Sequence, residues 1–265
     1  MADTGPEANH EAGEDMRLTP RLQFLIVAVV SVFALSLFSW PLIAPVGPEF
    51  SRTAAPTLAL SLLPLLVVAI GLLLEGSISG PKQLAMLATL SALAAATRIA
   101  TSGVGGFELV FVIVILGGRA FGIRFGFLLG LLSIASSSLF FGGIGPWTAF
   151  QMIAVGWVGA VAGLRFTRKT LSRRREVFGV AFYALLASYL FGLLMNLWFW
   201  PFAIGPETSI SYSPDASFTE NFGSFLFYSL ATSTLTWDTV RAISTAVVIL
   251  AIGQPILSVL RRAKI

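Results

Sequence analysis

The chain has 265 residues, a mean hydropathy of +0.86, and 11% charged against 56% hydrophobic residues. A soluble domain carries about 25% charged residues, so this composition excludes a soluble globule and indicates an all-α, polytopic membrane protein. The net charge is a modest +4, cysteine is absent, and His10 is the one histidine, which excludes a disulfide framework and a cysteine-ligated metal site.

Residues 1–21 precede the first apolar run. They carry five acidic side chains and no apolar periodicity, which predicts a disordered cytoplasmic tail. The apolar run that follows leads into WPLIAPVGP rather than a small-x-small cleavage site, so we expect no cleaved signal peptide.

Eight apolar runs approach the length of about 20 residues that a membrane-spanning helix needs. These runs are 22–40, 57–75, 83–100, 107–122, 125–141, 147–164, 177–200 and 240–260. We predict a membrane helix bundle in which two additional transmembrane helices (22–80) precede a six-helix unit (81–265). Residues 223–236 are ambiguous, either an interfacial segment or the outer part of a long last helix.

Basic residues in short loops predict the orientation. The loop after the sixth run, RFTRKTLSRRRE, carries six of them and the C-terminal RRAKI carries three, so both are expected in the cytoplasm. Counting back by single crossings places Arg119, Arg124, Lys82 and the N-terminus on the same side. The loops expected outside are 41–56, 101–106, 142–146 and 201–222.

Small residues recur in two of the runs. In LAMLATLSALAAATRIA, alanines at 88, 92, 96 and 100 are four residues apart and therefore line one side of a helix. Small residues let membrane helices approach closely, so this stripe contacts either another helix of the chain or a partner subunit. We interpret the glycines of the sixth run as internal packing: Gly156, Gly159 and Gly163.

The sequence lacks the usual devices of catalysis. No histidine is available within the runs for a Ser-His relay, no HExxH is present, and no glycine-rich loop ends in GK[ST]. GSISG resembles GxSxG, but Ile78 stands in its central position. We therefore expect no catalytic residue, no metal and no cofactor, although a carboxylate enzyme using Glu108 and Asp238 stays open.

Polar and aromatic side chains gather at the predicted outer helix ends, where they form a candidate pocket for a flat, polar organic molecule. Polar groups within a bilayer are costly and face a cavity or each other. The candidate substrate-binding residues are Arg98, Glu108, Trp147, Gln151, Asn196, Trp200 and Trp237.

Each candidate has a simpler interpretation. Arg98 can extend to lipid headgroups, and the tryptophans fit an interfacial aromatic belt. Hydrogen bonds between helices explain Gln151 and Asn196 about as well as a substrate does. Asp238 and Arg241, three residues apart on one helical side, predict a local ion pair.

From residue 82 onward the sequence resembles the substrate-binding (S) components of energy-coupling factor (ECF) vitamin transporters. The resemblance rests on the alanine-striped LAMLATLSALAAATRIA, the loop TSGVGGFE, GGRAFGIRFGFLLG, and GGIGPWTAFQM followed by GWVGAVAGL. NLWFWPF and WDTVRAISTAVVILAIGQPILSVLRR also fit this type of protein. The GPWT-x-x-Q element is similar to that of S components associated with cobalamin and its precursors.

The resemblance implies a non-enzymatic, multi-pass protein of a bacterial plasma membrane. It would bind a vitamin or related micronutrient from outside and work with a membrane T component and two cytoplasmic ATPases, with no nucleic-acid partner. It also implies that Ala88, Ala92 and Ala96 contact the T component. The alternatives are a membrane-embedded lipid-processing enzyme and a non-catalytic membrane assembly factor.

The resemblance also locates the substrate. It points to the 101–106 loop together with Trp147, Gln151 and Asn196. GGIGPWTAFQM is then a corner that supplies one wall of a substrate pocket. The two helices before residue 82 depart from the family pattern.

Overall fold

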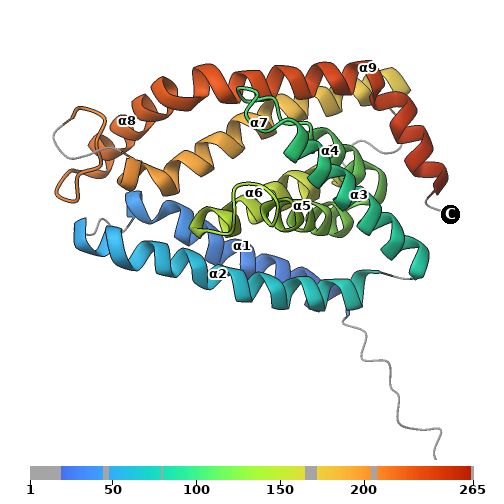
Figure 1. Cartoon of the computed structure of the whole chain (residues 1–265), viewed down its shortest axis with the longest axis horizontal. Helices are drawn as coiled ribbons and strands as arrows, with labels where there is room; N and C mark the ends of the chain where they lie inside the picture. The colour runs from blue at the N-terminus through green and yellow to red at the C-terminus, as the bar shows by residue number, and fades with distance from the viewer. Residues whose placement is uncertain (1–18, 44–47, 79, 165–171, 204–207, 264–265) are drawn as a thin grey trace, which may run out of the picture.

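A computed structural model of the chain describes residues 19–43, 48–78, 80–164, 172–203 and 208–263, and within them all regular structure is helical (Figure 1). Most of the tail predicted over 1–21 lies outside the described residues, and so does most of the basic loop 165–171. The protein is a polytopic membrane helix bundle, as its composition predicts.

Each of the eight predicted runs corresponds to one helix, and one further helical segment precedes the last. The elements are α1 (Pro20–Ile43), α2 (Pro48–Ser77), α3 (Pro81–Ala100), α4 (Val110–Phe121), α5 (Ile123–Ser138), α6 (Pro146–Ala162), α7 (Arg173–Ala203), α8 (Phe218–Ser229), the π-helix η1 (Leu230–Asp238) and α9 (Thr239–Ala263). The last three form one continuous helix of 46 residues, so the ambiguous segment 223–236 belongs to a long last helix.

The helices differ in length more than the eight apolar runs predict. Four are long and apolar enough to cross a membrane, at residues 21–43, 81–100, 173–203 and 218–263. By contrast α4, α5 and α6 have 12, 16 and 17 residues. At 1.5 Å per residue these three measure about 18–26 Å, less than the hydrocarbon thickness of about 30 Å. Gly122, with φ 107°, ends α4 and separates it from α5, and Gly142 and Gly143, with φ 81° and 67°, lie in the connection between α5 and α6.

The three short helices lie in the middle of the bundle, between α1 and α2 on one side and α7 and α9 on the other (Figure 1). Glycines make this arrangement possible. A Cβ atom on Gly118 of α4 or Gly126 of α5 would overlap the carbonyl oxygen of Gly159 in α6, and one on Gly159 would overlap that of Gly126. The glycines of α6 therefore serve internal packing, as predicted.

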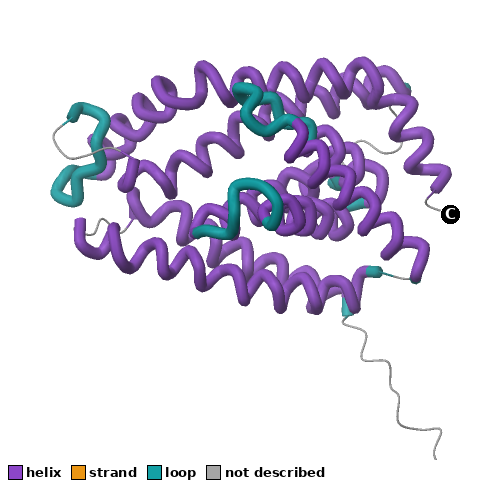
Figure 2. Tube along the Cα trace, in the orientation of Figure 1, coloured by secondary structure: helices purple, strands orange, loops and turns teal. Residues whose placement is uncertain are grey.

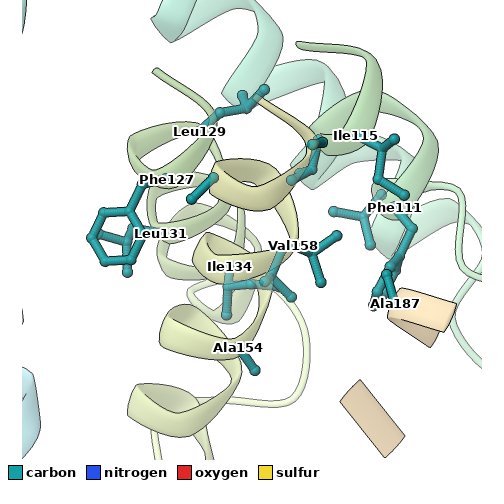
Figure 3. Close-up of a cluster of buried hydrophobic side chains, with 14 of the residues drawn as sticks. Phe111, Ile115, Phe127, Leu129, Leu131, Ile134, Ala154, Val158 and Ala187 are labelled. Carbon is teal, nitrogen blue, oxygen red and sulfur yellow. The ribbon is translucent and has the colours of Figure 1, made fainter. Parts of the chain in front are cut away.

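Around this glycine contact lies the main hydrophobic core (Figure 3). It takes side chains from α1 to α7 and from α9, and its centre includes Phe111, Ile115, Phe127, Leu129 and Val158. Burying such side chains contributes roughly 1.5–3 kcal/mol each in water, but in lipid close packing rather than dehydration stabilises the contact.

Helix α1 is packed directly on this core. The ring centroid of Phe38 lies 4.6 Å from the ring centroid of Phe150 and 5.9 Å from that of Trp157, both in α6. The Trp157 indole nitrogen donates a hydrogen bond of 2.8 Å to the Ser31 hydroxyl. The two additional helices are thus an integral part of the bundle.

A cluster of charged side chains defines one end of the bundle. Glu176, in the first turn of α7, accepts hydrogen bonds from Arg119 of α4 (2.7 Å) and from both terminal nitrogens of Arg261 of α9 (2.6 and 3.0 Å). We call this basic end, which the charge pattern predicts to be cytoplasmic, the inner end. The α3–α4 and α5–α6 connections belong to the opposite, outer end, and Figure 2 shows them nearer the middle of the molecule than the segment between α7 and α8.

Candidate functional site

Arg98 joins three helices at the outer end. It lies in the last turn of α3 and donates hydrogen bonds to the Ser137 hydroxyl of α5 (2.8 Å) and the Gln151 side-chain oxygen of α6 (2.9 Å). Its guanidinium is therefore held between helices and does not extend to headgroups. Charge-assisted hydrogen bonds of this kind are stronger than neutral ones, so this junction fixes where the short helices end.

The corner before α6 presents Trp147. Two positive-φ glycines, Gly142 and Gly143, reverse the chain, and the Gly145 N–H donates to the Thr148 hydroxyl (3.0 Å). Trp147 lies in the first turn and is 42% exposed. It is four residues before Gln151, so both lie on one side of α6.

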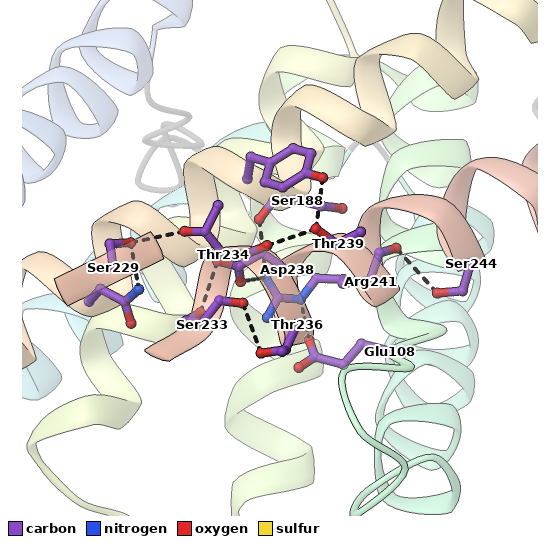
Figure 4. A network of polar contacts seen from close by, with 12 residues as sticks. Glu108, Ser188, Ser229, Ser233, Thr234, Thr236, Asp238, Thr239, Arg241 and Ser244 are labelled. Atoms are coloured by element: carbon purple, nitrogen blue, oxygen red, sulfur yellow. Dashed lines mark hydrogen bonds and ion pairs between the residues drawn. The ribbon is translucent and has the colours of Figure 1, made fainter. Parts of the chain in front are cut away.

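A second polar cluster centres on Arg241 (Figure 4). Its Nη1 lies 2.9 Å from the Asp238 carboxylate and donates to the Ser188 carbonyl (3.1 Å). Its Nε lies 3.3 Å from the Glu108 carboxylate. The predicted local ion pair of Asp238 and Arg241 is confirmed, and Glu108 is an additional partner. Asp238 is fully buried and Arg241 is 5% exposed.

The π-helical turn η1 supplies hydroxyl groups to this cluster. Ser233 donates to the second Asp238 oxygen (2.8 Å), and Thr239 donates to the Thr234 carbonyl (2.7 Å) (Figure 4). Gly192 of α7 faces the Asp238 carboxylate, where a Cβ atom would overlap it. π-Helical turns occur frequently at functional sites, and here the turn directs Asp238 inward.

The α3–α4 connection brings the two clusters together. Gly106, with φ 85°, packs against the backbone of Trp237, where a Cβ atom would collide. Glu108, on the same connection, interacts electrostatically with Arg98 as well as pairing with Arg241. We define the outer polar site as Arg98, Gln151, Glu108, Asp238 and Arg241.

The side chain of Trp237 borders this site and is half exposed. Two other predicted substrate-binding residues, Asn196 and Trp200, have different surroundings. Asn196 donates to the Ser229 hydroxyl (2.9 Å), which is a hydrogen bond between helices. Trp200 is fully buried among Tyr212 and Phe225 and donates to the Ile210 carbonyl (2.7 Å). Both side chains fasten α7 to the segment that follows it.

Two cavities found among the described residues lie away from this site. One of about 490 Å³ lies between α7 and α9 at the inner end, and an apolar one of about 250 Å³ lies between α1 and α2. None of the seven predicted substrate-binding residues lines either of them. At the outer polar site the side chains bond to one another. Within the described residues, no group of three His, Cys, Asp or Glu is arranged to hold a metal ion.

Helix α3 has two unlike faces. Leu87, Ser91 and Ala94 face the bundle and are buried. The opposite face carries the exposed alanines of the stripe: Ala88, Ala92, Ala96 and Ala100. Among the described residues, no other helix therefore covers the stripe.

Comparison with known proteins identifies the bundle. No curated protein and no solved structure matches the chain. The family model described as "ECF transporter, substrate-specific component" matches residues 82–253, which run from α3 into α9 and leave α1 and α2 outside the match. The chain therefore belongs to the family of substrate-specific components of ECF transporters.

Proposed function

We propose that this chain captures a vitamin or related micronutrient at its outer polar site for an ECF importer. The observation that carries the proposal is the Arg98–Gln151 hydrogen bond beside Glu108, where the outer ends of α3, α5 and α6 meet. A substrate with hydrogen-bond donors and acceptors would exchange partners with these side chains. The exposed rings of Trp147 and Trp237 offer flat apolar faces beside them.

The polar side chains of the site bond to one another when no substrate is bound, which explains how the empty site stays stable. Buried polar atoms are costly when unpaired, and here Arg98, Ser137 and Gln151 satisfy each other. We propose a cobalamin-related compound as the first substrate to test, because its peripheral amides suit both a guanidinium and a glutamine side chain.

The energy for transport would come from partner subunits. We propose that a membrane T component docks on the exposed alanines 88, 92 and 96, since small side chains allow close helix contact. Two cytoplasmic ATPases would complete the importer in a bacterial plasma membrane. The carboxylates of Glu108 and Asp238 both pair with Arg241, which favours a structural and binding role over an enzymatic one.

Ligand-induced stabilisation tests the proposal. The purified chain in detergent is heated with cobalamin, a corrinoid precursor and a panel of other vitamins. A ligand at 100 times its Kd stabilises a protein by about 2.7 kcal/mol, so a genuine substrate raises Tm by several degrees. The Trp147→Ala/Gln151→Ala variant should lose this shift.

A matched control variant, Phe178→Ala/Gln254→Ala, changes an exposed aromatic residue and a glutamine at the inner end. It should show the same ligand-induced rise in Tm as the unmodified chain. Tight binding that survives Trp147→Ala/Gln151→Ala would remove the outer polar site from substrate recognition. A Tm that no compound raises would favour the assembly-factor alternative.

A further inference from the structure

The cavity of about 490 Å³ at the inner end lies between the first turn of α7 and the last turns of α9. Residues three or four apart on each helix face it, so it is a groove between two helices. Its polar lining comprises Arg173, Glu176, Gln254, Ser258, Arg261 and Arg262.

The groove has an excess of positive charge. Glu176 already receives three hydrogen bonds, one from Arg119 and two from Arg261, so its charge is compensated and Arg261 is held in place. Arg173 and Arg262 make no hydrogen bond or ion pair among the described residues, and both are exposed. Two guanidinium groups at this groove are thus available to an anion.

The surroundings of the groove are apolar. Val177 and Leu257, which line it, are 7% and 3% exposed. The neighbouring residues Phe178 and Val259 are 63% and 54% exposed, so apolar helix surface flanks the basic groove. A ligand that fits both parts has an anionic head and an apolar body.

We propose that this groove binds the phosphate headgroup of an anionic phospholipid from the inner leaflet. Guanidinium groups bind phosphate oxygens through paired hydrogen bonds, and Ser258 and Gln254 add neutral donors. The cytoplasmic leaflet is rich in anionic lipids, and basic pockets between membrane helices on that side suit their headgroups. The acyl chains lie along the apolar surface that includes Phe178 and Val259.

Lipid titration of the purified full-length chain tests this site. Thermal unfolding in a mild non-ionic detergent is followed while dioleoyl phosphatidylglycerol, dioleoyl phosphatidylcholine or inorganic phosphate is added. We expect phosphatidylglycerol to raise Tm and the other two to leave it unchanged. Each arginine near a membrane surface contributes roughly fivefold in affinity, so Arg173→Gln/Arg262→Gln should weaken the apparent affinity about 30-fold.

The control variant is Arg174→Gln/Arg175→Gln, which also removes two positive charges. Both come from the first turn of α7 beside Arg173, but neither residue lines the groove. It should respond to phosphatidylglycerol like the unmodified chain. Equal weakening in both variants would show a diffuse effect of surface charge and overturn the site. A shift of the same size with phosphatidylcholine would remove headgroup selectivity, and one with inorganic phosphate would assign the groove to a free anion.

Discussion

Replacing Arg241 with methionine should destabilise the protein far more than neutralising its partly exposed partner Glu108. The change leaves the Asp238 carboxylate fully buried, with the Ser233 hydroxyl as its remaining side-chain donor. An uncompensated buried charge costs about 3–5 kcal/mol. Glu108 also loses its partner, but its side chain is 34% exposed and water compensates it.

The matched change is Glu108→Gln. Its carboxylate lies 3.3 Å from Arg241 and is partly solvated, so losing the pair costs less than about 1 kcal/mol. Adding Asp238→Asn to Arg241→Met should restore most of the lost stability, because no charge is then left buried. The asparagine has the same shape and still fits beside Gly192.

Thermal unfolding in detergent measures all three variants. For a chain of this size 1 kcal/mol corresponds to about 2–4 °C in Tm, so Arg241→Met should lower Tm by about 6–20 °C and Glu108→Gln by less than about 4 °C. The reasoning is refuted if Arg241→Met and Glu108→Gln have the same Tm. It is also refuted if Asp238→Asn fails to recover stability in the Arg241→Met background.

Three further predictions concern packing and docking. Gly159→Ala places a methyl group on a backbone carbonyl of α5 and should cost roughly 1–3 kcal/mol in a melting experiment. The control Gly179→Ala adds a methyl group in open space and should leave the stability unchanged. Equal Tm values for Gly159→Ala and Gly179→Ala would contradict the close approach of the short helices. Ala92→Leu should abolish co-purification with a T component at unchanged Tm, so an intact complex would remove α3 from that interface. Ser31→Ala leaves the Trp157 indole N–H unpaired and should lower the free energy of unfolding by about 1–3 kcal/mol, whereas an unchanged Tm would mean that this bond does not hold α1.

Much of the fold follows from local sequence. Apolar runs predict a helix for every one of α1 to α7 and α9, and glycine and proline mark most boundaries. The joining of α8 and η1 to α9 was ambiguous because the stretch at 230–238 is rich in Ser and Thr and only weakly apolar. In the structure these hydroxyls bond to side chains and carbonyls of the same helix, such as Asp238 and Tyr228, so they fit within a helix.

The site depends on tertiary contacts that local sequence leaves open. The sequence marks Arg98 and Gln151 as separate candidates, but they are 53 residues apart in α3 and α6, and no local pattern pairs them. Glu108 and Arg241 are 133 residues apart, and a local pattern pairs Arg241 with Asp238 alone. Trp200 looked like a rim residue because aromatic residues mark both interfaces and buried cores.

The continuous 46-residue helix from Phe218 to Ala263 reaches well beyond a lipid bilayer. At 1.5 Å per residue it is about 69 Å long, more than twice the hydrocarbon thickness of about 30 Å. The 25 residues of α9 alone are enough to cross, so the whole helix matches the bilayer only by tilting or by carrying α8 to the outer surface. The exposed rings of Phe218, Phe222 and Phe227 suit the interfacial region, where aromatic side chains anchor membrane proteins.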